Sequence, residues 1–271
     1  MAITLASISK GAILRAPRIV LIGVEKIGKT AFACGSRFDP SGKLVENGTN
    51  SPIVIPVKGE EGADAYEVPV FPTSNSVEDV FEAIGALCGE HDHRITVLDS
   101  ASALEPLIWD KVCRDNSNVD SIEKVGGGYG KGYTMAVGVW RQLLDGLDAL
   151  RSIRSMASII IGHVKVKRFD DPAGDSYDQY QFDIHDKAAN LLFRWADLIL
   201  FANTKVAVKK EDVGFNKEKN RGIDVTGGQR FLFTQKRPAH PGGGRGVYGQ
   251  LPYELPLDWT AFEAAVAAAA E

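Results

Sequence analysis

Cysteine is scarce in this 271-residue sequence, and its three cysteines stand far apart at Cys34, Cys88 and Cys113. The sequence contains no CxxC pair and no Cys/His spacing typical of zinc ligands. This pattern argues against a disulfide framework or a structural zinc site as the basis of the fold. We expect reduced thiols that pack as small apolar side chains, as in a protein of the cytoplasm.

Long apolar runs are also absent, because no stretch approaches the roughly 18 consecutive apolar residues of a membrane-spanning helix. Residues 1–17 lack the features of a signal peptide and are interpreted as an N-terminal arm or strand. The sequence therefore predicts a cytoplasmic protein without a membrane partner. A formal net charge of -4 disfavours a protein wrapped on nucleic acid, but it allows a local basic groove.

Short apolar runs alternate with amphipathic segments through most of the chain. Unbroken runs such as RIVLIG predict buried strands, and apolar residues three and four apart predict helices. Ser76 and Asp79 form the pattern of a capping box. The predicted strands are 18–23, 51–57, 94–100, 157–163, 197–203 and 230–235, and the predicted helices are 29–36, 76–90, 133–155, 188–196 and 261–271. This order predicts an α/β fold with a mostly parallel central sheet flanked by helices.

We predict a single domain over residues 1–259, followed by a helical tail at 260–271. Three segments interrupt the alternation and are predicted to be long loops: 121–133, 164–187 and 209–229. Loops of this length in a compact domain are usually functional or disordered. Ligands of parallel sheets bind at the carboxyl ends of the strands, so polar residues that end strands become site candidates.

The strongest motif is GVEKIGKT at residues 23–30, directly after a predicted strand. Its spacing is that of a phosphate-binding loop. Gly23 permits the turn, Gly28 lets backbone N–H groups approach phosphate oxygens, and Lys29 neutralises the β and γ phosphates. The Thr30 hydroxyl is a ligand for Mg²⁺, and the helix that follows faces the anion with its N-terminus. The predicted nucleotide-binding residues are Gly23, Val24, Glu25, Lys26, Ile27, Gly28, Lys29, Thr30 and Ala31.

Asp99, Glu60 and His163 each end or follow a predicted strand and can complete this site. Asp99 is expected to hold Mg²⁺ together with Thr30, because magnesium keeps several waters and needs few carboxylates. Glu60 or Glu61 can polarise the attacking water, and the sequence leaves this choice open. His163 is a candidate for sensing the γ-phosphate. The catalytic candidates are Glu60, Lys29 and His163.

Two adjacent cations, Lys236 and Arg237, follow the strand predicted at 230–235. Adjacent cations on a surface are commonly just solvated. The functional alternative is that they reach the nucleotide of a neighbouring subunit, as arginine fingers do in trans.

Several of these motifs together resemble the core of RecA/RadA-type recombinases. GVEKIGKT has Glu25 as its third residue, ITVLDSASALEPL resembles the strand of the second metal-binding motif, and TQKRPAH resembles the late strand with cations for the adjacent subunit. More closely, YGKGY, HVKVKRFDDP, KKEDVGFNK and ELPLDW resemble segments of phage-encoded Sak-type ATPases, the ATP-dependent single-strand annealing proteins. The similarity runs from about residue 8 to residue 259.

The resemblance implies a RecA-like P-loop NTPase with antiparallel strands toward the C-terminus and with DNA-stimulated ATP hydrolysis. ATP and Mg²⁺ are the implied cofactors. The implied partners are single-stranded DNA, further copies of the chain in a ring or filament, and a single-strand binding protein, in the host cytoplasm if the chain is phage-encoded. Segments 121–133 and 164–187 become DNA-facing loops, and the trans role falls on Lys236 and Arg237. The implied DNA contacts are Lys131, Lys165, Lys167, Arg168 and Phe169.

Two features depart from the family pattern. His163 stands where these recombinases usually have a glutamine that couples the nucleotide to DNA. Segment 164–187 carries four cations against six carboxylates, whereas a DNA-binding loop is expected to be net positive. The alternative function is therefore a nucleotide-dependent switch or scaffold that acts on protein partners without binding DNA. A helicase-type motor on the same core ranks third, because the chain shows no obvious accessory domains.

Overall fold

The central sheet has the strand order β13-β11-β8-β1-β6-β5-β4. The computed structural model describes residues 15–38, 43–171, 174–212, 218–224 and 226–271. Parallel pairing joins β4 (Pro52–Pro56), β5 (Ile95–Asp99), β6 (Ala157–Phe169), β1 (Arg18–Gly23) and β8 (Leu198–Thr204). Antiparallel pairing adds β11 (Arg230–Phe233), β12 (Gly243–Gly244) and β13 (Glu254–Pro256). The predicted sheet, mostly parallel with antiparallel strands toward the C-terminus, is confirmed.

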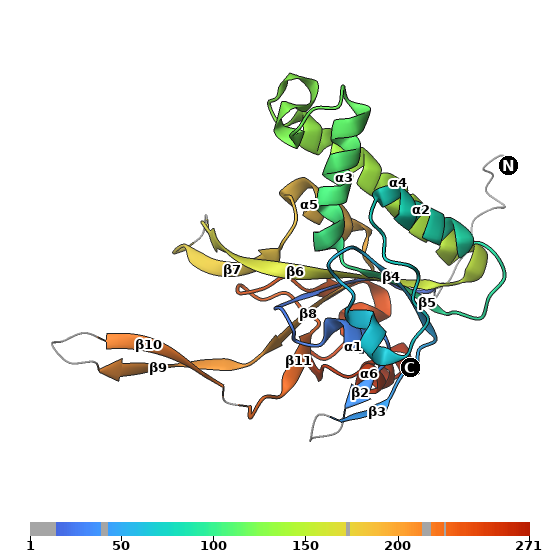
Figure 1. Cartoon of the computed structure of the whole chain (residues 1–271). Coiled ribbons are helices and arrows are strands. Elements are labelled where there is room, and N and C mark those ends of the chain that lie inside the picture. The colour runs from blue at the N-terminus through green and yellow to red at the C-terminus, as the bar shows by residue number, and fades with distance from the viewer. Residues whose placement is uncertain (1–14, 39–42, 172–173, 213–217, 225) are drawn as a thin grey trace, which may run out of the picture.

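Helices cover both faces of the sheet (Figure 1). One face packs against α2 (Val77–Ala86), α3 (Ala101–Asp115), α4 (Lys131–Arg154) and α5 (Asp186–Trp195). The other face packs against α1 (Lys29–Ala33), α6 (Trp259–Ala270) and the 3-10 helix η4 (Gly246–Gln250). Strand β1 shows why: Val20 and Ile22 belong to one core and Ile19 and Leu21 to the other, since successive side chains point to opposite faces.

Helices α2, α3, α5 and α6 each begin after a residue whose side chain accepts a backbone hydrogen bond. Ser76 Oγ accepts a hydrogen bond from Asp79 N, and the Asp79 carboxylate accepts one from Ser76 N, which confirms the predicted capping box. Helix α3 is absent from the sequence prediction because it begins directly after β5, with Ser100 as its N-cap. The predicted tail is helical, but its Phe262 is buried against Phe32 of α1, so α6 belongs to the core.

The prediction of a loop over 164–187 is wrong. Strand β6 continues past His163 to Phe169 and pairs antiparallel with β7 (Tyr177–Phe182), and α5 begins at Asp186. The stretches VKVK at 164–167 and YQF at 180–182 alternate apolar or aromatic residues with polar ones, a strand pattern that the charge of the segment obscures. The resulting β6–β7 hairpin projects beyond the sheet (Figure 1).

The loop predicted at 121–133 is also largely wrong. Residues Ile122–Gly127 form the 3-10 helix η3, in which Ile122 and Val125 are buried, and α4 already begins at Lys131. Gly126 and Gly127 at the end of η3, and Gly128 and Gly130 between the two helices, all have positive φ, so the glycine-rich composition reflects tight turns. The side chain of Tyr129 is fully exposed between them.

Several short elements complete the chain. In the segment 209–229, β9 (Val206–Asp212) pairs antiparallel with β10 (Glu218–Asp224), which replaces most of the predicted loop. A second small hairpin joins β2 (Arg37–Phe38) to β3 (Leu44–Glu46), and η2 (Gly62–Tyr66) follows β4. Most of the predicted N-terminal arm, residues 1–14, lies outside the described residues. None of the helices in the described ranges is long and apolar enough to span a bilayer.

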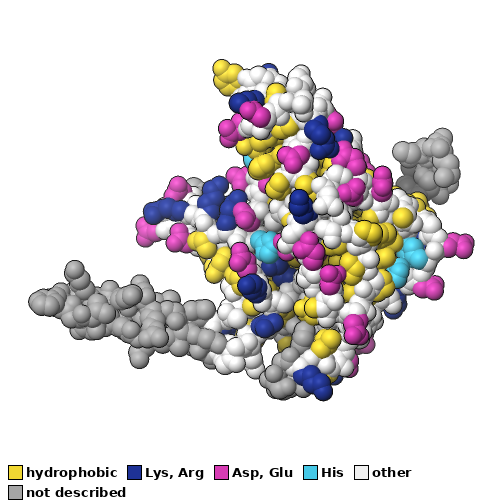
Figure 2. All heavy atoms as spheres, in the orientation of Figure 1, with side chains coloured by type: hydrophobic (Ala, Val, Ile, Leu, Met, Phe, Trp, Pro, Cys, Tyr) yellow, Lys and Arg dark blue, Asp and Glu magenta, His cyan; other side chains and the backbone are white. Residues whose placement is uncertain are grey.

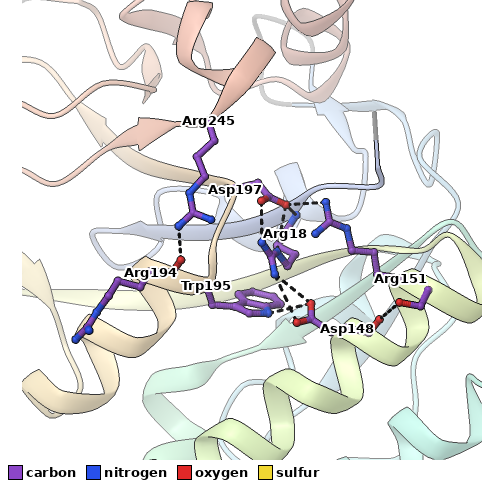
Figure 3. Close-up of polar contacts among 8 residues, drawn as sticks. Arg18, Asp148, Arg151, Arg194, Trp195, Asp197 and Arg245 are labelled. Atoms are coloured by element: carbon purple, nitrogen blue, oxygen red, sulfur yellow. Dashed lines mark hydrogen bonds and ion pairs between the residues drawn. The ribbon is translucent and has the colours of Figure 1, made fainter. Parts of the chain in front are cut away.

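An ion-pair cluster ties the amino ends of β1 and β8 to α4 (Figure 3). The Asp197 carboxylate pairs with Arg18 at 2.9 Å and with Arg151 at 3.0 Å, and Asp148 accepts a hydrogen bond from Trp195 Nε1 at 3.1 Å. Burial opposes ionisation of Asp197, but the hydrogen bonds from Arg18 outweigh it and lower the pKa of the carboxyl group. The cluster fixes the edge of the sheet opposite the phosphate loop.

Replacing Asp197 with alanine is expected to lower the free energy of unfolding by about 3 kcal/mol, because Arg151 loses its ion-pair partner and Arg18 is left with Asp148. Urea denaturation at pH 7 measures the loss. Glu46→Ala, which breaks the exposed pair with Arg37, is the matched control and is expected to change little. An equal loss in both variants would contradict a structural role for the cluster.

Candidate active site

The phosphate loop lies between β1 and α1, at the carboxyl edge of the sheet. A Cβ at Gly23 would collide with the backbone of Ala202 in β8, and Gly28 has a φ of 107°, so both positions require glycine. Lys29 is 5% exposed, and its Nζ donates hydrogen bonds to the carbonyl oxygens of Gly23 and Val24 at 3.0 and 2.9 Å. Burial lowers the pKa of Lys29, and the nearby carboxylates act in the opposite direction. The ammonium group therefore lies at the centre of a backbone cradle.

Thr30 and Asp99 bring two oxygen donors together beside this cradle. Thr30 Oγ1 donates a hydrogen bond to Asp99 Oδ2 at 2.8 Å, and Asp99 is 3% exposed at the end of β5. Burial raises the pKa of Asp99 to about 6, although the Thr30 hydrogen bond opposes the shift. A hydroxyl and a carboxylate are the hard donors that Mg²⁺ prefers, so this pair fits a magnesium ion that also binds nucleotide phosphates.

Glu60 is held from two directions. Its Oε1 lies 2.6 Å from His163 Nε2 and accepts a hydrogen bond from Ser100 Oγ at 3.0 Å. The His163 hydrogen bond lowers the pKa of Glu60 and outweighs the opposing effect of burial, so the carboxylate is ionised at neutral pH. Glu61, by contrast, is exposed and accepts a hydrogen bond from Gly59 N. Between the two candidates, only Glu60 contacts the other residues of the site.

The predicted site residues separate into two groups. The phosphate loop, Asp99, Glu60 and His163 meet at the carboxyl edge, although His163 lies within β6 and not at its end. Lys236 and Arg237 follow β11, which runs antiparallel to β8 and so leads the chain away from this edge. Both side chains are exposed, and the Arg237 guanidinium lies 4.2 Å from the Tyr253 ring centroid.

Two residues of the site are not among the predicted site residues, although the first of them lies within the ITVLDSASALEPL motif. Ser100 holds Glu60 while its hydroxyl also caps α3. Arg230 starts β11, and its Nη1 lies 3.1 Å from the position of a Cβ added at Gly28. The antiparallel direction of β11 brings the first residue of this strand, and not its last, to the carboxyl edge. That direction is the signal that could have pointed to Arg230.

The Arg230→Ala variant is expected to bind ATP about tenfold more weakly, because a charge-assisted hydrogen bond to phosphate contributes about 1.5–3 kcal/mol. Titration with a fluorescent ATP analogue measures the dissociation constant. The control is Arg141→Ala on the exposed side of α4. An unchanged dissociation constant in the Arg230 variant would show that the guanidinium does not reach the nucleotide.

The predicted DNA contacts lie on the β6–β7 hairpin, apart from Lys131. Each basic residue of the hairpin faces a carboxylate: Lys165 pairs with Asp183, Lys167 with Asp186 and Arg168 with Asp170. Basic and acidic side chains accordingly lie side by side over the projecting hairpin (Figure 2). The ring centroids of Phe169 and Tyr177 are 5.4 Å apart. Lys131 Nζ donates a hydrogen bond to the carbonyl oxygen of Gly126. The structure thus places these residues on the surface without a separate basic patch.

The α/β fold and the phosphate loop beside the Thr30–Asp99 pair define the class: a P-loop ATPase. A family model described as an AAA domain matches residues 15–246, and the chain belongs to this family. A search of curated proteins found no match. The matched region contains all of the candidate site residues, so nucleotide binding, usually with Mg²⁺, is the property that family and site share.

Proposed function

We propose that this ATPase binds single-stranded DNA and promotes strand annealing, as its resemblance to Sak-type proteins implies. The observation that carries the proposal is the path of β6. His163 in this strand contacts Glu60 at the candidate active site, and the same strand continues as the β6–β7 hairpin. A change at the γ-phosphate that moves Glu60 would therefore move His163 as well. Because His163 belongs to β6, this movement would be passed along the strand to the hairpin. This connection supports DNA contacts that depend on the nucleotide state.

The site supports ATP hydrolysis by positioning and electrostatics. Lys29 and the backbone amides of the loop bind the β and γ phosphates. Thr30 and Asp99 would hold Mg²⁺, which supplies charge neutralisation at the phosphate oxygens when bound. The Glu60 carboxylate accepts a hydrogen bond from the attacking water and orients it toward the γ-phosphate. Ser100 and His163 keep that carboxylate in place.

Assembly into a ring or filament is part of the proposal. Lys236 and Arg237 do not point to the phosphate loop of their own chain, so a neighbouring copy is the remaining partner for a catalytic role. In the test, Lys29→Ala subunits are mixed with Arg237→Ala subunits. Recovery of ATP hydrolysis in the mixture supports action in trans, and no recovery contradicts it. A single-strand binding protein is proposed as a further partner at the DNA.

The experiment that tests DNA binding is fluorescence anisotropy of a labelled single-stranded oligonucleotide at low salt. We expect affinity at least about tenfold higher with a non-hydrolysable ATP analogue than with ADP. The His163→Ala variant is expected to lose this difference while it still binds nucleotide. Absence of DNA binding in every nucleotide state would contradict the proposal.

A second candidate is a nucleotide-dependent switch that acts on protein partners. The observation that favours it is the pairing of Lys165, Lys167 and Arg168 with carboxylates, which leaves less positive charge for phosphates. This function predicts ATP binding, slow hydrolysis and no response to DNA. The anisotropy titration distinguishes the two candidates directly.

A further inference from the structure

A cavity of about 450 Å³ lies between β7, α5 and the turn over 236–242. The turn is tied to β7, because Tyr180 N donates to Ala239 O at 2.8 Å and Gln179 Nε2 donates to Pro238 O at 2.8 Å. The cavity therefore has a fixed wall on the side of β7, and its volume is that of a small-molecule site. No residue of the candidate active site lines it.

The lining combines aromatic rings, amide groups and cations. Phe193 contributes a partly buried ring, whereas the Phe182 ring, with its centroid 5.7 Å away, is 2% exposed and belongs to the core. Gln181 and Asn190 contribute side-chain amides, and within the described residues neither amide has a hydrogen-bond partner, in contrast to Gln179. These groups supply both donors and acceptors to a ligand. Lys236 lies at the same cavity, and none of the ion pairs among the described residues includes it.

The strand register connects the cavity to one face of the hairpin. Phe169 pairs with Tyr177, Lys167 with Gln179 and Lys165 with Gln181, and these cross-strand pairs share a face because side chains alternate along each strand. An aromatic pair at the outer end is thus followed by two lysine–glutamine pairs, of which Gln179 and Gln181 also line the cavity. These three cross-strand pairs therefore form a continuous row of side chains on one face of the hairpin, and the row ends at the cavity.

We propose that the cavity binds a nucleobase of a single DNA strand that runs along this hairpin face. Amide side chains pair with the mixed donor and acceptor edge of a base, and the partly buried Phe193 ring offers the base a stacking surface. Lys236 lies at the cavity for a flanking phosphate, whereas Lys167 is paired with Asp186. The inference rests on the proposed DNA binding and adds a base-dependent component to it.

The test compares two labelled oligonucleotides of equal length, one with thymine bases and one with abasic sites throughout its centre. Both present the same phosphates, so the difference in their affinities isolates the bases. We expect the wild-type protein with ATP analogue to bind the thymine strand about tenfold more tightly. The double variant Gln181→Ala/Asn190→Ala is expected to bind both strands as the wild type binds the abasic one. Its ATP hydrolysis without DNA is expected to match that of the wild type.

The control is Gln142→Ala, which removes an exposed amide from α4 and is expected to keep the preference. Asn190→Ala alone, on the exposed side of α5, is expected to lose part of the preference and tests the same site with a milder change. Equal wild-type affinity for the two strands would overturn the inference while DNA binding stands. Failure of both strands to bind would overturn the proposed function as well. A double variant with normal base preference but altered assembly size would assign the cavity to a subunit contact and overturn the inference.

Discussion

Glu60→Gln is expected to reduce ATP hydrolysis by a factor of about 10²–10⁴ while nucleotide affinity stays within about threefold. The carboxylate that contacts His163 and Ser100 is ionised at neutral pH and can accept a hydrogen bond from the attacking water. Glutamine has the same size and can still accept a hydrogen bond from Ser100, but it lacks the charge that polarises water. Single-turnover hydrolysis with a separate binding titration distinguishes the two effects.

Glu61→Gln is the matched control, since this neighbour is exposed and its carboxylate accepts a hydrogen bond from the backbone of Gly59. We expect its hydrolysis rate to remain near that of the wild type. A large loss in the Glu61 variant together with a normal rate in the Glu60 variant would reverse the assignment.

Lys29→Ala is expected to abolish detectable hydrolysis and to weaken ATP binding by about 10²-fold or more. The buried ammonium group of Lys29 lies at the centre of the loop, where it donates hydrogen bonds to the carbonyl oxygens of Gly23 and Val24. This position is next to the expected binding site of the phosphates, so the ammonium group can bind them directly. Isothermal titration with ATP and Mg²⁺ measures the loss of affinity.

Lys26→Ala provides a control within the same loop, because the side chain of Lys26 is exposed. Alanine can adopt the φ of 55° at this position about as well as lysine does. Binding is expected to change by less than about threefold. A comparable loss in both variants would indicate that general positive charge, and not the position of Lys29, governs affinity.

The sequence is sufficient to locate Asp99, Glu60 and His163 beside the phosphate loop, because each ends or follows a strand predicted from its apolar run. Parallel strands bring their carboxyl ends to one edge, so Asp99 and Glu60 converge there although 39 positions separate them. Arg230 is not predicted by this rule, because it begins an antiparallel strand. The direction of a strand in the sheet depends on the tertiary structure and not on its local sequence.

The hairpin and η3 were missed for a different reason. The charges of Lys165, Lys167 and Arg168 made an exposed loop the natural interpretation, but ion pairs with aspartates and cross-strand hydrogen bonds hold these residues in strand conformation. In 121–133 the glycines suggested irregular chain, whereas Ile122 and Val125 bury their side chains against α3 and α4. The amino-acid composition of a segment does not show which other residues its side chains will contact in the folded protein.

Steady-state ATP hydrolysis at low salt, with and without single-stranded DNA, tests the central claim most directly. The account predicts that DNA raises the rate several-fold in the wild-type protein and that Lys29→Ala is inactive under both conditions. If hydrolysis depends on Lys29 but its rate does not change with DNA, the assignment as an AAA-domain ATPase stands and the proposed coupling to DNA is contradicted.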